Sequence, residues 1–193
     1  KDLLYFRVDR KKKILVSTLL LALGFNKSDM INEFYDKEVY NFDSKSKKWK
    51  TKFNPENYKS KNFSEEIIDA KSNKVIIKKG EKINYLKAKK LHSDGLKEII
   101  VSSEFLFGKY LTKQFILGED TFKIGTELNE TIVNKVIEQN ITTIETAYTN
   151  SINKGPYLLQ TIFNDKNESK NDAINEIYKV LRPGEPPTID IAS

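Results

Sequence analysis

The sequence predicts an α+β protein whose two ends are mostly helical and whose middle combines strands with helices. Apolar residues recur at helical spacing near both ends, in 14–23 and 174–181. Between them, apolar and polar residues alternate in 38–42 and in 49–53, which indicates a β-hairpin. A pattern in the second half of this middle part occurs twice, which indicates a repeated unit that contains both strands and helices.

The first elements of the chain are expected to be a short strand and a pair of helices. Residues 3–8 mix apolar and basic side chains as a short strand does, and 9–13 form a charged turn. Residues 14–23 predict a buried helix that ends at Gly24, a residue suited to a left-handed cap. Ser28 is the expected cap of a second helix, whose apolar face would consist of Met30, Ile31, Phe34 and Tyr35.

The middle of the chain begins with the hairpin, whose turn is expected at 43–47, followed by a polar connection at 55–66. The repeat comes next, and its two copies are offset by 45 residues. Each copy has a strand, a glycine turn, an asparagine that caps a helix, and a left-handed residue that leads into another strand. Two β-α-β-like repeats are therefore expected, on strands 75–77 and 121–124, turns Gly80 and Gly125, caps Asn84 and Asn129, and left-handed Gly95 and Asn140.

The last part of the chain starts at Gly155-Pro156, with a strand expected at 157–163 and a turn at 164–167. Ser169-x-x-Asp172 is typical of a capping box and opens the final helix. Its apolar face runs up to Arg182, and Pro183, Pro186 and Pro187 then end the helix and stiffen the chain. The guanidinium would stand at a rigid corner, or it would only complement the helix macrodipole.

Composition and charge limit the class of protein. With 193 residues, of which 38% are apolar and 11% aromatic, the chain can bury a core. Zero cysteines exclude disulfides and thiolate metal sites, and the longest apolar run, 14–23, is too short to span a membrane. There is no initiator methionine and both ends look cut, so we expect a piece of a larger protein.

The basic residues are the strongest functional signal. The net charge is +6, and only Arg7 to Lys13 forms a concentrated run, beside the aromatic residues Tyr5 and Phe6. The chain contains three arginines in a lysine-rich composition, which indicates a need for the planar guanidinium where they remain. Basic residues beside aromatics can hold single-stranded nucleic acid, although a solvated basic turn is the simpler alternative. The candidate DNA-binding residues are Arg7, Arg10, Lys11, Lys12, Lys13 and Arg182.

Other chemistry has little support. His92 is the single histidine, so triads and multi-histidine metal sites are excluded. A small hydrolase would have to use the adjacent acids Glu65-Glu66 or Glu119-Asp120, which are more simply solvated. A helix-turn-helix DNA reader would expose basic residues on its second helix, and 29–35 has none. No catalytic, cofactor or metal residues are predicted.

Three motifs together resemble one family. Ile177-Tyr178 followed by Arg182-Pro183-Gly184-Glu185-Pro186-Pro187-Thr188 is similar to a signature in the second lobe of the bacterial RNA polymerase β subunit. Gly155-Pro156-Tyr157 and the basic segment 6–13 resemble two more segments of that lobe, in family order. The resemblance covers essentially the whole chain. It departs from the family pattern at Lys11 and Lys12, where the family has arginines.

The resemblance implies a discontinuous, mostly helical lobe of 1–35 and 155–193, interrupted by a lineage-specific insertion of 36–154. The lobe would form part of the DNA cleft and position downstream or non-template DNA, and the insertion would dock regulators. The implied partners are DNA, the α, β′ and ω subunits and a σ factor, in the cytoplasm at the nucleoid and without a membrane. The catalytic Mg²⁺ would be bound by another subunit. The alternative from the residues alone is a stand-alone basic domain that binds nucleic acid or a protein.

Overall fold

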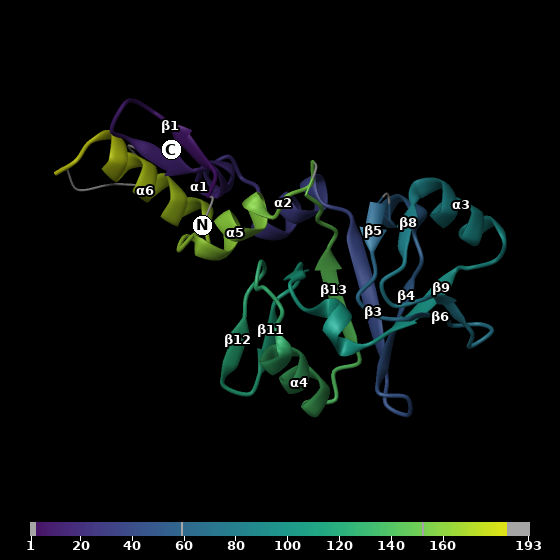
Figure 1. Cartoon of the computed structure of the whole chain (residues 1–193). Coiled ribbons are helices and arrows are strands. Elements are labelled where there is room, and N and C mark those ends of the chain that lie inside the picture. The colour runs from purple at the N-terminus through teal and green to yellow at the C-terminus, as the bar shows by residue number, and fades with distance from the viewer. Residues whose placement is uncertain (1–2, 59, 152, 185–193) are drawn as a thin grey trace. The chain divides into compact units, whose positions relative to one another are not determined.

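The computed structural model describes residues 3–58, 60–151 and 153–184 (Figure 1). The chain divides into two compact units, each formed by separate stretches of sequence. Unit 1 consists of Lys1–Asp36, Tyr110–Thr126 and Thr149–Ser193, and unit 2 of Lys37–Lys109 and Glu127–Tyr148. Helices and strands make up 34% and 26% of the described residues, so the predicted α+β class is confirmed. The boundaries 1–35, 36–154 and 155–193 remain predictions.

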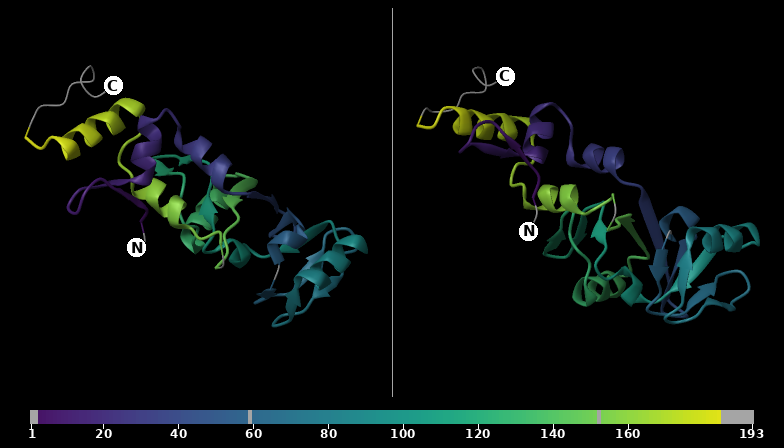
Figure 2. Two further views of the ribbon diagram at one scale, coloured as in Figure 1. Left: turned by 90° about the horizontal axis from the view of Figure 1, so that it is seen from above. Right: turned by 45° about the horizontal axis from the view of Figure 1, so that its top comes forward.

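Unit 1 is built mainly from helices contributed by both ends of the chain. Helix α1 packs against α2, α5 and α6, and a two-stranded hairpin, β1–β2, lies beside α6 (Figures 1 and 2). Two further short strands, β11 and β12, pair with each other in the middle stretch. The bounds are β1 Tyr5–Arg7, β2 Lys13–Leu15, α1 Val16–Ala22, α2 Lys27–Phe34, β10 Tyr110–Leu111, β11 Phe115–Leu117, β12 Asp120–Phe122, α5 Tyr157–Asn164 and α6 Lys170–Leu181.

The N-terminal helices differ from the prediction in their boundaries. Residues 13–15 were expected in a turn and a helix, but they form β2, which pairs with β1. Helix α2 is capped by Asn26 and not by Ser28, because the Asn26 side chain and Asp29 form a reciprocal capping box. Of the predicted apolar face, Phe34 is 48% exposed. Gly24 follows α1 with a positive φ of 102°, as predicted.

The strand expected at 157–163 is wrong, since these residues form helix α5. Pro156 stands at its N-cap, and Leu158, Leu159 and Ile162 are buried on one side of the helix. Apolar residues at positions i, i+1 and i+4 suit a helix, and a short apolar run alone does not distinguish the two structures. The predicted Ser169 cap of α6 is confirmed, because its hydroxyl accepts a hydrogen bond from the Asp172 backbone N–H.

A buried carboxylate joins the two ends of the chain inside unit 1. Asp165, which is 1% exposed, lies in the connection between α5 and α6. Its Oδ2 accepts hydrogen bonds from the hydroxyls of Ser17 (2.5 Å) and Thr18 (2.8 Å) in α1. Its Oδ1 accepts from the backbone and side-chain nitrogens of Asn167, both at 2.9 Å. The buried charge is therefore stabilised by four donors.

Unit 2 is organised around an antiparallel sheet. The strand order within this unit is β13-β3-β4-β9-β6-β7, and β5 and β8 form a separate pair. The largest buried side chains are aromatic, and Phe53, Tyr58 and Phe63 stack in sequence. The bounds are β3 Lys37–Asp43, β4 Lys48–Lys52, η1 Pro55–Tyr58, β5 Ser60–Asn62, β6 Ile67–Asp69, β7 Val75–Ile77, β8 Lys82–Asn84, α3 Tyr85–Ser93, β9 Glu98–Val101, η2 Ser103–Leu106, α4 Glu130–Glu138 and β13 Thr143–Ala147.

The predicted hairpin of the middle part is confirmed as β3–β4, whereas the polar connection at 55–66 contains η1 and β5. Asn84 and Asn129 cap α3 and α4, and Gly95 and Asn140 have positive φ angles, as predicted. The prediction of two β-α-β units is not confirmed. The first predicted strand, β7, lies in the same sheet as β9 with β6 between them, whereas β12 pairs with β11 and does not join the sheet that contains β13. Strand β8, which follows the Gly80 turn, pairs with β5.

Candidate nucleic-acid interface

The basic segment predicted from the sequence forms the β1–β2 hairpin of unit 1. The turn is closed by a hydrogen bond from the Val8 N–H to the Lys12 carbonyl, at 2.9 Å. Inside the turn, Asp9 Oδ1 accepts from the backbone N–H groups of Lys11 (2.8 Å) and Lys12 (3.0 Å). The acidic residue of the motif therefore orders the turn that carries the basic ones.

The two faces of this hairpin carry different side chains. Phe6 and Ile14 lie opposite each other on one face, where Ile14 is 5% exposed and Phe6 is 51% exposed. Since neighbouring residues of a strand point to opposite faces, the directly paired Arg7 and Lys13 lie together on the other face. Both are exposed, and the Lys13 Nζ lies 4.2 Å from the centre of the Tyr5 ring.

The pairing of Arg7 with Lys13 is unfavourable for the isolated hairpin. Like charges placed directly opposite each other on two strands repel and destabilise the pair. The aromatic ring of Tyr5 beneath Lys13 offsets part of this cost, because the face of an aromatic ring attracts a cation. Two cations with an aromatic ring beside them form a surface that an anionic ligand with a planar group would stabilise.

The remaining candidates in the segment lie in or next to the turn. Arg10 and Lys11 are exposed, and Lys12 is half-buried. The structure therefore places all five predicted basic residues of 7–13 on one hairpin. None of them is buried, so each is accessible to a large ligand in unit 1.

Arg182 is the C-cap residue of α6. Its backbone N–H donates to the Tyr178 carbonyl at 2.8 Å, and its guanidinium lies 5.9 Å from the centre of the Tyr178 ring. The side chain is exposed. Helix α6 ends at Leu181, just before Arg182-Pro183, as predicted. The rest of the motif, Glu185 to Thr188, lies outside the described residues. Helix α6 packs beside β2, which places both groups of candidates in one part of unit 1 (Figure 2).

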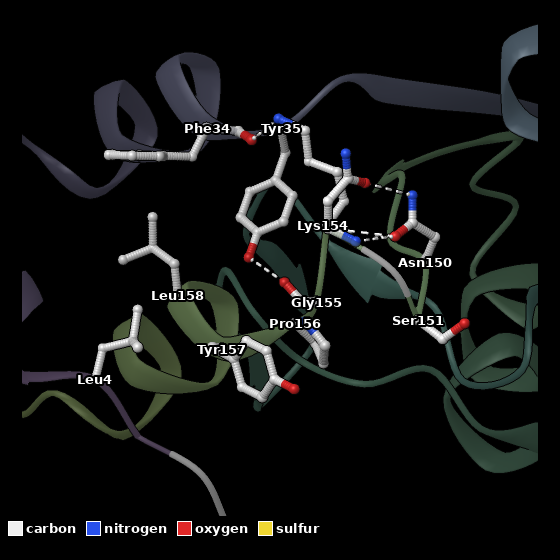
Figure 3. Close-up of a pocket in the computed structure, with 11 residues that line it drawn as sticks. Leu4, Phe34, Tyr35, Asn150, Ser151, Lys154, Gly155, Pro156, Tyr157 and Leu158 are labelled. Atoms are coloured by element: carbon white, nitrogen blue, oxygen red, sulfur yellow. Dashed lines mark hydrogen bonds between the residues drawn. The ribbon is translucent and has the colours of Figure 1, made fainter.

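A hollow that the sequence analysis missed lies at the other end of β1. It has a volume of about 570 Å³ and lies between the end of α2, the loop before α5 and the start of α5 (Figure 3). The Tyr35 hydroxyl donates to the Gly155 carbonyl at 2.8 Å, and the Lys154 Nζ donates to the Phe34 carbonyl at 3.1 Å. Burial raises the pKa of the Tyr35 hydroxyl. The lining residues are Leu4, Phe34, Tyr35, Asn150, Ser151, Asn153, Lys154, Gly155, Pro156, Tyr157 and Leu158.

The structure of the hollow explains why the Gly155-Pro156-Tyr157 motif begins with a glycine. A Cβ atom on Gly155 would collide with the ring of Tyr157, so the glycine lets that ring fold back over the chain. Tyr157 is 47% exposed and stands at the rim. The motif identifies one wall of the hollow in the sequence, but it does not indicate which residues lie opposite that wall.

The acidic pairs and the histidine do not form a site in the described part of the chain. Both carboxylate oxygens of Glu65 accept hydrogen bonds from Ser102, at 2.9 and 2.8 Å, and Glu119-Asp120 belongs to the exposed β11–β12 turn. His92 lies on α3 beside Lys97. Among the described residues, no group of three or more potential metal ligands is found. Within the same residues, no helix has the length and apolar character required to cross a membrane.

Comparisons with known proteins give one consistent result. No family model matches the chain. The whole chain is 35% identical, over 195 aligned residues, to DNA-directed RNA polymerase subunit beta of Rickettsia felis, and 34% identical to that of Rhizobium leguminosarum bv. trifolii. The same subunit of Rickettsia conorii is also 35% identical. The chain spans 14% of the length of each of these relatives.

Proposed function

We infer that the chain is a segment of the β subunit of a bacterial DNA-directed RNA polymerase, and we propose that it forms the second lobe of that subunit. In this proposal 1–35 and 155–193 are the lobe, and 36–154 is an insertion that docks regulators. The support is the similarity of the whole chain to a part of known β subunits, together with the three motifs in family order.

The lobe is proposed to form part of the DNA cleft and to position downstream or non-template DNA. The observation that carries this role is the open face of the β1–β2 hairpin, where Arg7 and Lys13 stand opposite each other beside Tyr5. Cations follow the phosphates of a single strand, while aromatic rings and guanidinium planes stack on its bases. Bound phosphates would also relieve the repulsion between the two cations.

The remaining functions are proposed for the whole polymerase. Nucleotidyl transfer would occur elsewhere in the enzyme, with the catalytic Mg²⁺ bound by another subunit and no catalytic residue in this segment. Its partners would be DNA, the α, β′ and ω subunits and a σ factor. The complex would act in the cytoplasm, at the nucleoid.

The first experiment tests the hairpin. Affinity of the 193-residue chain for a fluorescent oligo-dT is measured by anisotropy at several salt concentrations, for wild type and for Arg7→Gln/Lys13→Gln. If each cation neutralises one phosphate, the slope of log K against log salt should decrease by about 1.4, since each single-strand contact contributes about 0.7. The control, Lys166→Gln/Lys170→Gln, removes the same charge from exposed positions of unit 1. Equal slopes for the two double variants would contradict the proposed role of the hairpin.

The second experiment tests Arg182 in the complete polymerase. Arg182→Lys and Arg182→Ala should both shorten the lifetime of the promoter open complex, because a lysine cannot replace the planar fork of donors. The melting temperature of the 193-residue chain should change little, since a helix-end charge contributes only about 0.3–1 kcal/mol. A normal lifetime for Arg182→Lys would show instead that Arg182 serves the helix end and the Tyr178 ring.

A further inference from the structure

Unit 2 contains a second basic surface, which is more highly charged than the hairpin. Residues 71–97 contain nine lysines and two acidic residues, which gives this stretch a net charge of +7, compared with +6 for the whole chain. All nine lysines are exposed. The rest of the chain is therefore close to neutral, and the positive charge of the protein is concentrated in one part of unit 2.

Six of these lysines surround α3 and the turn before it. We call Lys78, Lys79, Lys82, Lys87, Lys89 and Lys90 the α3 surface. Lys78 to Lys82 form the turn into β8, and the others lie on the helix. The Lys87 Nζ bonds to Glu81 at 2.6 Å, which holds the first turn of α3 against the preceding loop. This ion pair lowers the pKa of Glu81.

The backbone under these lysines is fixed by buried neighbours and by the helix cap. Ile83 and Ala88 are 0% exposed, so β8 and α3 are anchored through these buried side chains. The Asn84 side chain accepts the Lys87 N–H at 2.8 Å and starts the helix. At the other end, the Lys97 Nζ donates to the His92 carbonyl at 2.9 Å. The α3 surface is thus carried by a rigid scaffold.

We propose that the α3 surface binds the phosphate backbone of double-stranded DNA without reading its sequence. It is composed of lysines and contains no arginine, and lysines act on phosphates as point charges without the bidentate geometry of arginine. Helix α3 has nine residues and is therefore about 13 Å long. A duplex presents about eight phosphates over that length, roughly twice as many as a single strand.

The composition of the surface favours DNA over two other anionic partners. A membrane-bound helix needs a continuous apolar face, and an acidic peptide usually adds apolar anchors to its charges. Within α3 the one large apolar side chain that is strongly exposed is Leu86, at 75%. The contact is independent of the hairpin, which belongs to unit 1, so it extends the proposed function to a second unit.

The experiment compares two triple variants of the 193-residue chain on a 20-base-pair duplex labelled with a fluorophore. Lys82→Gln/Lys89→Gln/Lys90→Gln should reduce the slope of log K against log salt by about 2.7, since each duplex contact contributes about 0.9. The control, Lys45→Gln/Lys50→Gln/Lys52→Gln, removes the same charge from exposed lysines on β4 and the preceding turn in the same unit. It should leave most of the slope unchanged, and circular dichroism should show both variants folded.

Several outcomes would overturn this proposal. Equal loss of slope in the two triple variants would show that only net charge matters. Tighter binding of polyglutamate than of duplex at the same salt would indicate an acidic protein partner, and tighter binding to anionic lipid vesicles would indicate a membrane. The hairpin variant Arg7→Gln/Lys13→Gln, measured on the same duplex, distinguishes this proposal from the proposed function of the hairpin. Its slope of log K against log salt should stay close to that of the wild type, whereas the slope of the α3 variant should decrease.

Discussion

Unit 1 and unit 2 are stabilised by different chemistry. The largest fully buried side chains of unit 2 include five aromatic residues, Trp49, Tyr40, Tyr58, Phe53 and Phe63, packed on and beside one sheet. Unit 1 instead buries aliphatic residues such as Met30 and Ile31 together with polar Ser17, Thr18 and Asp165. Truncation of a buried aromatic side chain leaves a cavity, whereas removal of the buried carboxylate leaves hydrogen-bond donors unpaired. The two units should therefore respond to different substitutions.

The largest expected effect is in the aromatic core of unit 2. Phe53 is 0% exposed and stacks on Tyr58 at 4.9 Å between ring centres, so Phe53→Ala should destabilise unit 2 by about 3–5 kcal/mol. Trp49 is the single tryptophan and lies in unit 2, so its fluorescence during urea unfolding reports that unit alone. Phe53→Leu, which retains most of the buried volume, is the control and should destabilise unit 2 by less than Phe53→Ala does.

The next effect concerns the buried carboxylate of unit 1. Asp165→Ala leaves the Ser17 hydroxyl without its acceptor and leaves the Thr18 hydroxyl only the longer contact with Glu176, at 3.4 Å, which should cost about 3 kcal/mol. Helix unfolding followed by circular dichroism should shift to lower urea, while the Trp49 transition stays in place. Asp165→Asn keeps one acceptor oxygen, so it should lower the free energy of unfolding of unit 1 by less than Asp165→Ala does. If the Trp49 transition shifted by as much as the helix transition, the two units would unfold as one. That result would contradict the separate responses expected of unit 1 and unit 2.

A smaller effect with the opposite sign is expected on the hairpin. Arg7→Gln removes the repulsion with Lys13, so the free energy of unfolding of unit 1 should rise by a few tenths of a kcal/mol. Lys13→Gln also loses the contact with the Tyr5 ring, and should show little or no gain. Thermal unfolding by circular dichroism measures both. A loss of stability in Arg7→Gln would mean that the arginine has a structural role.

The smallest effect depends on pH. The hydrogen bond from Lys87 holds the pKa of Glu81 below its ordinary value of 4.5, so the ion pair contributes to stability above that value. Its contribution is lost as the pH falls through the lowered pKa of the folded state. Because the pair is largely exposed, Glu81→Gln should cost at most a few tenths of a kcal/mol at pH 7. Urea titrations of the two proteins should converge in acid, and a difference that persists there would contradict the assignment.

Local signals were predictable from the sequence, and long-range partners were not. The caps Asn84, Asn129 and Ser169 depend on residues within one turn, and all three were identified correctly. Ser28 was chosen wrongly because Asn26, two residues earlier, has the same capping ability and a matching acid in Asp29. Strand β8 was not predicted, and nothing in residues 82–84 specifies its pairing with β5.

The candidate sites follow the same division. The hairpin was found because its five cations lie within seven residues of sequence, whereas the α3 surface was missed because its lysines are spread over a turn, a strand and a helix. The direct pairing of Arg7 with Lys13 depends on the register of β1 and β2. The hollow depends on residues more than a hundred positions apart, such as Tyr35 and Gly155, and no local pattern indicates that they meet.

The contacts of Asp165 also set the order in which the chain can fold during synthesis. Its two hydroxyl partners precede it by 148 and 147 residues. At about 5–20 residues per second, a ribosome needs roughly 7–30 s to travel that distance. For this interval α1 exists without the acceptor that its Ser17 and Thr18 require, while most of unit 2 has already been made. Unit 2 should therefore fold first, and the N-terminal helices can complete their packing only after Asp165 has been synthesised.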